Sequence, residues 1–288
     1  MICDGNKIIA VEDGEKLPFD ISSSSTVKDF TLKKAKLVDE NIFLLDIMNI
    51  IAFFHTKNKL VGCISLEPTN ILLVNSSEGT RGILSSIPSS SLGSQEEDLC
   101  AAGFLLHYVW TSGINAYGAI QKITNDCLKN NLIERMTDSK SGINVKDVLC
   151  DLAFWSKQKR LSFMMKVSDI LELKQKKHAD AIEDKKSQII GLSWKLRLPL
   201  VIQKKIDIDS KKRRTYYTTE VKDLLRVIRN LAHHFHELAP DVQAALGPVD
   251  DLADFWTSTF PLLLPSVYHA MAPFKGDTNC ARIKMYYP

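Results

Sequence analysis

The sequence lacks the features of secreted and membrane-spanning proteins. It has no run of about 18 or more apolar residues, so no transmembrane helix is expected. Its first segment, MICDGNKIIAVEDGEKL, carries charges within the apolar part and does not resemble a secretory signal. The six cysteines are scattered without a CxxC pair, which argues against a disulfide framework and against a zinc site built on cysteine. We expect a soluble, cytoplasmic protein.

Acidic residues are scarce in one part of the chain. Between Lys157 and Arg214 there are 17 Lys and Arg against 7 Asp and Glu, a net charge of +10; the whole chain carries +3, so the remainder carries −7. A basic block beside a more acidic remainder suggests contact with a polyanion. The alternative is a solvated helix face rich in lysine, which is the commoner meaning of a charge run.

Hydrophobic residues make up 45% of the chain, enough for a buried core. Apolar residues at helical spacing predict a helix within 41–60, and a stretch that is apolar nearly all round predicts a buried helix over 98–113. The run ILLV at 71–74 predicts a short strand. Ser-rich stretches at 22–26 and 75–97 are expected to be loops.

The composition changes near Ala153 to alternating basic and apolar residues. We place a domain boundary there, with one domain over 1–153 and a second over 154–288. Both are expected to be mostly helical, with a few short strands in the first. The fold class is therefore mainly α.

The stretch DLLRVIRNLAHHFHEL, residues 223–238, places basic and amide side chains on an amphipathic helix. Its apolar residues form one stripe at helical spacing. Arg226, Asn230 and His234 are four residues apart, so they lie on one line opposite that stripe, and Arg229 flanks the line. This line carries Arg, Asn and His in place of the usual Glu and Lys of a solvated face.

The residues around this helix predict its ends. Thr218 or Thr219 is a plausible N-cap, and Pro240 ends the helix or follows it closely. Ahead of the helix, the segment KKRRTYYTT brings Tyr216 and Tyr217 close to its amino-terminal end.

Three interpretations of the polar line are open. A zinc site would use His233, His234 and His236, but helix residues one or two apart do not face each other, and no further ligand pair stands at the right spacing. A solvated helix face is the second interpretation. The third is RNA cleavage without a metal ion, which needs a general base, a general acid and donors for the charge that grows on the phosphate oxygens.

The residue types of the line suit that third chemistry. Histidine titrates near neutral pH and serves as acid or base, and arginine holds phosphate through two hydrogen bonds at once. Asparagine adds a neutral donor, and a tyrosine hydroxyl can take the second proton-transfer role. Taken alone, the spacing of these residues only suggests a nuclease.

Two longer stretches resemble a known domain family. RRTYYTTEVKDLLRVIRNLAHHFHEL, followed by LGPVDDLADFWTSTFPLLLPSVYHAM, resembles the kinase-extension nuclease (KEN) domain. That domain is shared by the inositol-requiring kinase/endoribonucleases of the unfolded protein response and by ribonuclease L. The resemblance runs from about Phe154 to Met271 and includes the RTY segment, the DLLR…RN…H helix and the F…FP.L…Y..M ending.

The resemblance implies an all-α ribonuclease domain that cleaves RNA as a dimer, without metal, and leaves a 2′,3′-cyclic phosphate. The catalytic residues of the family fall on Tyr216, Arg229, Asn230 and His234. By resemblance, His234 would be the general acid and Tyr216 the general base. Arg229 and Asn230 would hold the scissile phosphate. The implied partner is RNA, with unpaired loops as targets, and not DNA.

The upstream part resembles the C-lobe of a protein kinase. LVGCISLEPTNILLV, residues 60–74, is similar to the catalytic loop H-R-D-L-K-P-x-N. Cys63, Ile64 and Ser65 stand where that pattern has His-Arg-Asp, and Glu67 stands in place of its lysine. The D-F-G motif, the A-P-E motif and the glycine-rich loop of the kinase family are all missing from this sequence. The region before residue 40 is too short for an N-lobe. We expect a pseudokinase remnant without kinase activity, bound ATP or any other cofactor.

The degenerate kinase part leaves three functions open. The chain is an active endoribonuclease that dimerises with itself, or a non-catalytic regulatory partner that forms mixed dimers with a full-length kinase/endoribonuclease of the unfolded protein response. A third possibility is a decaying gene product that folds poorly, and a truncated gene model would also explain the missing N-lobe. The intact set of Tyr216, Arg229, Asn230 and His234 favours the first, because a pure regulator has no chemical need for it.

Overall fold

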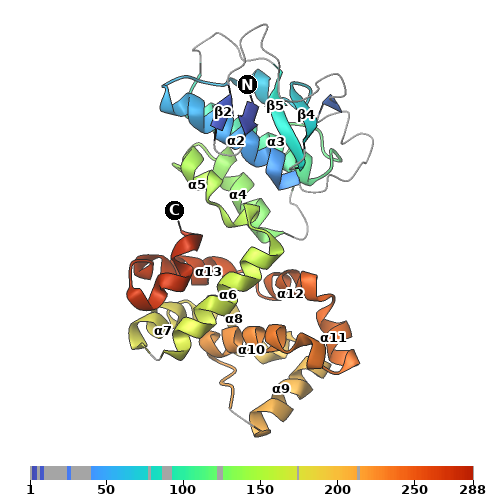
Figure 1. Ribbon diagram of the computed structural model, residues 1–288, viewed down its shortest axis with the longest axis vertical. Helices are drawn as coiled ribbons and strands as arrows, with labels where there is room; N and C mark the ends of the chain where they lie inside the picture. Colours follow the sequence, from blue (N-terminus) through green and yellow to red (C-terminus); the bar gives the residue numbers. More distant parts are fainter. Residues whose placement is uncertain are drawn as a thin grey trace. The chain divides into compact units, whose positions relative to one another are not determined.

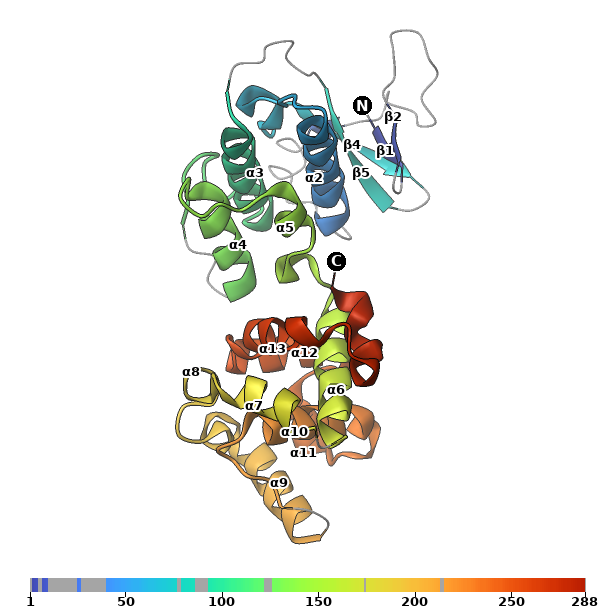
Figure 2. The same ribbon diagram turned by 90° about the vertical axis from the view of Figure 1, so that its left-hand side faces the viewer.

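The chain divides into two compact units, Met1–Phe154 (unit 1) and Trp155–Pro288 (unit 2). Figures 1 and 2 show them in a computed structural model. The structure describes residues 2–4, 7–9, 25–26, 40–76, 79–85, 93–121, 126–173, 175–212 and 215–287. The chain is mainly α-helical, as expected. None of the helices in these ranges is both long and apolar enough to cross a membrane.

Unit 1 packs helices against a small antiparallel sheet. Its helices are α2 (Glu40–Thr56), η2 (Cys63–Leu66), α3 (Gln95–Trp110), α4 (Cys127–Thr137), α5 (Val145–Leu149) and η3 (Leu152–Phe154). Its strands are β1 (Ile2–Asp4), β2 (Lys7–Ile9), β3 (Ser25–Thr26), β4 (Ile71–Ser76) and β5 (Gly79–Leu84). The strands β3, β4 and β5 form one sheet in that order, and β1 pairs with β2.

The predicted helices and the predicted strand at 71–74 are confirmed. The helix expected within 41–60 is α2, and the buried helix expected over 98–113 is α3, which lies beside α2 in the unit (Figure 2). The run ILLV begins β4. A capping box between Ser94 and Glu97 fixes the first turn of α3, because each side chain bonds the backbone N–H of the other residue.

The expected loops at 22–26 and 75–97 are partly wrong, and β4 continues to Ser76 while α3 already begins at Gln95. Gly79–Leu84 forms β5, paired with β4 in the register Ile71 to Leu84, and Ser25–Thr26 forms β3 on the other side of β4. The cause in β5 is tertiary packing: the strand also packs on α2, so burial of Ile83 and Leu84 outweighs the weak strand preference of its glycines. Residues 22–24, 77–78 and 86–92 lie outside the described residues.

Two buried carboxylates tie the unit together. Asp98 on α3 accepts hydrogen bonds from the backbone N–H groups of Val61 (2.9 Å) and Gly62 (2.8 Å), and its Oδ2 lies 3.0 Å from His55 Nε2. Asp46 on α2 accepts two bonds of 2.8 Å from the guanidinium of Arg81. Both carboxylates are almost fully buried, so each needs these partners to offset the loss of water.

Unit 2 is all helical. Its α-helices are α6 (Lys157–Glu172), α7 (Lys176–Glu183), α8 (Lys186–Ile190), α9 (Leu200–Lys212), α10 (Val221–His233), α11 (Pro240–Leu246), α12 (Leu252–Thr259) and α13 (Leu263–Met271). Its 3-10 helices are η4 (Trp194–Arg197), η5 (Phe235–Glu237), η6 (Val249–Asp251), η7 (Ala272–Phe274) and η8 (Thr278–Tyr286). The long helix α6 contacts α10, α12, α13 and η8, and its path through the middle of the unit is visible in Figure 1.

The apolar stripe of α10 is confirmed, because its apolar residues from Val221 to Leu231 are buried. The predicted start of the helix is wrong. The N-cap is Glu220 and its side chain makes no capping bond. The carboxylate of Glu183 on α7 accepts the backbone N–H of Lys222 at 2.9 Å instead, so a neighbouring helix supplies the cap that the threonines were expected to give. The helix ends at His233, and η5 carries Phe235 onward into the core.

Candidate functional site

The polar face of α10 is ion-paired with α6 and is not a solvated surface. Arg229 Nη1 donates to Asp169 Oδ1 at 3.0 Å, and Arg226 Nε donates to Glu172 Oε1 at 2.8 Å. Arg226 also pairs with the fully buried Asp223 at 2.8 Å. Both arginine side chains are only 15% exposed. The two guanidiniums are therefore held in fixed positions.

A chain of hydrogen bonds joins three of the four expected catalytic residues. The amide Nδ2 of Asn230 donates to the hydroxyl oxygen of Tyr216 at 2.8 Å. The Oδ1 atom of Asn230 accepts from Arg229 Nη2 at 3.4 Å. These contacts bring a phenol, an amide and a guanidinium from two segments to one place. A guanidinium carries five N–H donors, so these bonds leave Arg229 able to donate to a further oxygen.

The segment that carries Tyr216 is fixed by buried groups on both sides. Asp223 Oδ2 accepts the backbone N–H of Tyr217 at 2.6 Å. The indole N–H of Trp194, a fully buried residue of η4, bonds the carbonyl of Glu220 at 3.1 Å and approaches that of Tyr217 at 3.3 Å. The backbone N–H of Trp194 bonds the carbonyl of Thr218 at 3.0 Å. Tyr216 therefore lies on a loop just ahead of α10 that these hydrogen bonds hold in place.

His234 lies one turn further along, at the C-cap of α10. Its backbone N–H bonds the carbonyl of Asn230 at 3.1 Å, so its position follows that of the asparagine. Its side chain is 54% exposed, and Nδ1 lies 3.1 Å from Glu237 Oε2. In the described part of the chain the imidazole makes no hydrogen bond to the other three residues. The structure thus joins Tyr216, Asn230 and Arg229 directly and places His234 beside them, open to solvent.

Burial raises the pKa of the Asp223 carboxyl above its ordinary value, against the opposing effects of the Tyr217 N–H and of Arg226. Burial also raises the pKa of the Glu183 carboxyl that caps α10, against the Lys222 N–H. Neither carboxylate belongs to the expected catalytic set. Glu183 holds the start of α10, and Asp223 holds the loop that carries Tyr216.

The sequence did not reveal four residues that hold the site: Asp169, Glu172, Asp223 and Trp194. Asp169 and Glu172 stand three apart in a segment that is otherwise strongly basic. Residues at that spacing share one helix face, so the pair could have been expected to face cations. Asp223 and Trp194 carry no comparable signal, because their roles depend on the packing of distant helices.

Several lysines of the basic segment 157–214 are ion-paired with aspartates in the structure. Lys157 pairs with Asp251 and with Asp254 at 2.6 Å, and Lys177 pairs with Asp277 at 2.5 Å. Inside the segment, three further lysines pair with aspartates: Lys185 with Asp184, Lys195 with Asp207 and Lys205 with Asp209. Exposed pairs of this kind leave part of the positive field in place. The segment keeps a basic character, and several of its lysines also have structural partners.

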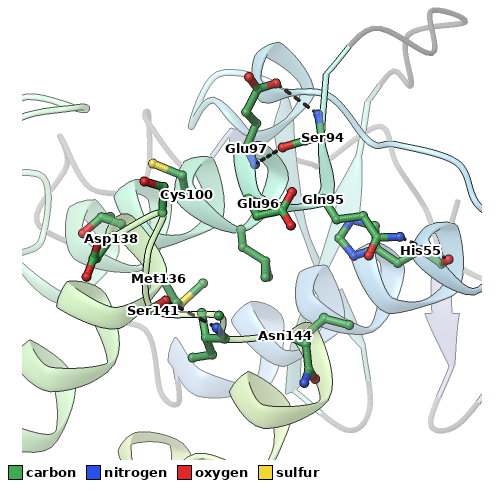
Figure 3. Close-up of a pocket in the computed structure, with 16 residues that line it drawn as sticks. His55, Ser94, Gln95, Glu96, Glu97, Cys100, Met136, Asp138, Ser141 and Asn144 are labelled. Atoms are coloured by element: carbon green, nitrogen blue, oxygen red, sulfur yellow. Dashed lines mark hydrogen bonds between the residues drawn. The ribbon is translucent and has the colours of Figure 1, made fainter.

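Unit 1 contains a cavity of about 480 Å³ between the start of α3, the end of α4 and the segment that leads into α5 (Figure 3). Glu96, Glu97 and Asp138 are among its lining residues, together with His55 and Cys100. The described residues that line it include no lysine and no arginine. A site with three carboxylates and no lysine or arginine is unsuited to a polyanion.

The loop of unit 1 that resembles a kinase catalytic loop has no carboxylate at the position of the base. Ser65 stands there and is 1% exposed, whereas Ile64 beside it is 70% exposed. The amide of Asn70 donates to the carbonyl of Ile64 at 2.7 Å and closes the loop. The loop is folded, but its side chains are not those of a phosphoryl-transfer site.

Comparisons with known proteins find a family model and several relatives that match most of unit 2. The family model described as Ribonuclease 2-5A matches residues 160–286. The serine/threonine-protein kinase/endoribonuclease ire-1 of Caenorhabditis elegans is 29% identical over 232 residues, 73% of this chain and 23% of that protein. The human serine/threonine-protein kinase/endoribonuclease IRE2 is 34% identical over 144 residues, 49% of this chain and 14% of that protein.

A third relative is the sensor for unfolded proteins in the ER, ire1, of Schizosaccharomyces pombe, 25% identical over 201 residues, 61% of this chain and 18% of that protein. The chain thus spans less than a quarter of the length of each of these relatives. The matches agree with the resemblance that the RTY and DLLR…RN…H segments carry. Residues 160–286 of this chain thus match the Ribonuclease 2-5A family model, which supports the kinase-extension nuclease domain expected from the sequence.

Proposed function

We propose that unit 2 is an endoribonuclease that cleaves RNA without a metal ion and leaves a 2′,3′-cyclic phosphate and a 5′-hydroxyl. The observation that carries the proposal is the hydrogen-bonded set of Tyr216, Asn230 and Arg229 beside an exposed His234. The family of the unit and the names of its relatives support the same activity. RNA is the partner, and DNA is excluded because the reaction needs a 2′-hydroxyl.

The roles follow from the chemistry of each group. Tyr216 acts as general base and takes the proton of the ribose 2′-hydroxyl as its oxygen attacks the phosphorus. The bond from phosphorus to the 5′-oxygen then breaks, and His234 as general acid protonates that leaving oxygen. Arg229 and Asn230 donate hydrogen bonds to the non-bridging phosphate oxygens, whose charge grows during the reaction.

The ion pairs of Arg229 fit this role. A guanidinium that Asp169 and Glu172 already hold loses little side-chain freedom when it binds phosphate, so its donors are preorganised. The two carboxylates also keep the uncomplexed site from attracting anions too tightly. The proposal therefore makes Asp169 and Glu172 positioning residues.

Replacing Tyr216 by phenylalanine tests the proposal. The variant keeps the ring but loses the hydroxyl that Asn230 contacts, and cleavage of a labelled RNA stem-loop in EDTA is expected to fall by about a hundredfold. Tyr217→Phe is the matched control, because this neighbouring ring is 59% exposed, and it should cleave at the wild-type rate. Equal rates for Tyr216→Phe and the wild type would remove Tyr216 from the mechanism.

We propose that unit 1 has no kinase activity and binds no ATP. Cys63, Ile64 and Ser65 stand where a kinase has its catalytic triplet, and phosphoryl transfer needs the base, the lysine and the metal-binding aspartate together. The unit serves as a folded pseudokinase support, like a kinase C-lobe, that leads into the nuclease.

The active form is proposed to be a dimer, either of two copies of this chain or of this chain with a full-length kinase/endoribonuclease. The second pairing would join this chain to a protein of the kind that its relatives' names describe, a kinase and an endoribonuclease in one chain. For a self-dimer, the cleavage rate should rise faster than linearly with protein concentration until the dimer saturates. A folded sample that cleaves at no concentration would favour the non-catalytic regulatory partner.

A further inference from the structure

Three metal-ligating side chains meet in unit 2 away from the nuclease site. His178 lies on α7, and Asp277 and Cys280 lie at the start of η8, about a hundred residues later. Their ligand atoms all lie within 4.8 Å of one another. His178 Nε2 is 3.3 Å from Asp277 Oδ2 and 3.6 Å from Cys280 Sγ. Among the described residues, this is the one group of three or more His, Cys, Asp or Glu side chains that gathers so closely.

These separations match the edges of a zinc coordination tetrahedron. Zinc binds His nitrogen and carboxylate oxygen at about 2.1 Å and Cys sulfur at about 2.3 Å, which places nitrogen and oxygen about 3.4 Å apart and nitrogen and sulfur about 3.6 Å apart. The observed values are 3.3 Å and 3.6 Å. The carboxylate of Asp277 is 34% exposed and has room to turn toward the sulfur, closing the third edge.

The surroundings suit a bound cation with one open position. His178 and Cys280 are fully buried, so the imidazole and the thiol are shielded, while the half-exposed Asp277 leaves a path for water. The edge of the imidazole packs against the ring of Phe274 at 4.8 Å between centroids, which orients it. Its Nδ1 atom is buried without a hydrogen-bond partner in the described part of the chain.

We propose that His178, Asp277 and Cys280 bind one Zn²⁺ ion, with water as the fourth ligand. The set is one thiolate, one imidazole and one carboxylate, which suits zinc better than a hard cation such as Mg²⁺. Asp277 and Cys280 are separated by two residues, the spacing at which two side chains chelate one ion. The sequence argued against a zinc site built on cysteine because it has no CxxC pair. A search for CxxC does not detect an Asp-x-x-Cys pair whose third ligand is a distant histidine.

The site lies where it can hold the end of the chain in place. The segment η8 packs on α6, and its Tyr286 lies 5.4 Å from the ring of Trp155 and 5.2 Å from that of Phe163. Zinc would bind η8 to α7 and so stabilise a segment of irregular 3-10 structure. The ion has no part in the cleavage chemistry, so activity in EDTA and zinc binding are independent properties.

A neighbouring ammonium group competes with the ion. Lys177 Nζ lies 2.5 Å from Asp277 Oδ2, so zinc must displace the lysine from this oxygen or share the carboxylate with it. The Cys280 thiol binds as a thiolate and releases its proton to solvent when zinc binds.

The test is metal titration of the reduced full chain after EDTA has been removed by gel filtration. Zn²⁺ is titrated against a chromophoric chelator, and Co²⁺ is used as a spectroscopic substitute. We expect one ion per chain, the thiolate-to-cobalt charge-transfer absorption, the strong visible bands of a tetrahedral ion, and a higher midpoint of thermal unfolding with Zn²⁺. Asp277→Asn, which replaces a half-exposed side chain, should weaken binding by about 10- to 100-fold, and Cys280→Ser should abolish the charge-transfer band.

Two further variants separate this site from adventitious thiol binding. Cys127→Ser removes an exposed thiol elsewhere and should leave the affinity and the spectrum unchanged. Lys177→Met removes the competing ammonium and should tighten zinc binding by about two- to fivefold. Absence of a bound ion, or binding that Asp277→Asn and Cys280→Ser leave unchanged while Cys127→Ser abolishes it, would overturn the proposal. Because none of these measurements uses RNA, their failure would not bear on the nuclease.

Discussion

Replacing His234 by alanine is expected to lower the rate of RNA cleavage about a thousandfold, within the range of about 10² to 10⁴ that general acid catalysis contributes. The 5′-oxygen is a poor leaving group unless it is protonated, and His234 is the imidazole placed beside the Tyr216–Asn230 pair. The loss should appear in kcat, since Arg229 still binds the phosphate. Single-turnover cleavage of a labelled stem-loop measures it directly.

The control for this variant is His236→Ala. His236 is exposed and only two residues away, and it has no role in the mechanism, so its rate should stay within about twofold of the wild type. Neither substitution should change the midpoint of thermal unfolding by more than a degree or two, because His234 is 54% exposed and its side chain contacts the exposed Glu237. If His234→Ala cleaved at the wild-type rate, another group would have to supply the proton.

Replacing Asp223 by alanine is expected to lower the free energy of unfolding of unit 2 by about 3 kcal/mol, the size typical of breaking a buried ion pair. The carboxylate is fully buried, pairs with Arg226 and accepts the N–H of Tyr217. Its removal leaves that N–H without its acceptor and frees the loop that carries Tyr216, so cleavage should fall as well. Urea unfolding of the variant and the wild type gives the difference in stability.

Asp223→Asn separates the two effects. The amide oxygen can still accept the Tyr217 N–H, so the loop and the cleavage rate should be largely kept, with a smaller loss of stability. Equal damage from both substitutions would mean that charge, and not the hydrogen bond, holds the loop.

The stability contributed by Asp223 should depend on pH in a stated direction. Burial raises the pKa of its carboxyl in the folded state above the ordinary value of 3.8, so the folded state holds the proton more tightly than the unfolded chain does. The part of its contribution that comes from the bound proton is complete below about pH 3.8 and is lost as the pH rises through the folded pKa, whereas the Tyr217 hydrogen bond and the Arg226 pair remain. Asp223→Asn carries no such proton, so the Asn variant should gain stability relative to the wild type as the pH rises above 4.

Much of the fold could be predicted because its helices carry their own periodic signal. The apolar face of α10 and the buried surfaces of α2 and α3 are visible in the spacing of their residues. The start of α10 and the strand β5 could not be predicted. Glu183 from another helix caps the start of α10, and β5 forms because it packs on α2 and pairs with β4. Such partners are distant in sequence and leave no local pattern.

In the candidate site, too, some residues could be predicted from the sequence and others could not. Tyr216, Arg229, Asn230 and His234 were predicted by residue type, spacing and resemblance, and the first three lie in one hydrogen-bonded chain. The groups that hold them, Asp169 on α6 and Trp194 on η4 among them, emerge only when the helices are packed. The same holds for the group of His178, Asp277 and Cys280, because His178 is about a hundred residues away from the other two.

The most direct test of the central claim is the chemistry of the ends of RNA cleaved by this chain in EDTA. Mass spectrometry of the products should find a 2′,3′-cyclic phosphate on one fragment and a 5′-hydroxyl on the other, and both should form about a thousandfold more slowly with His234→Ala. Products with a 5′-phosphate and a 3′-hydroxyl, formed only when Mg²⁺ is added, would contradict the account, because they require attack by metal-activated water and not by the ribose hydroxyl.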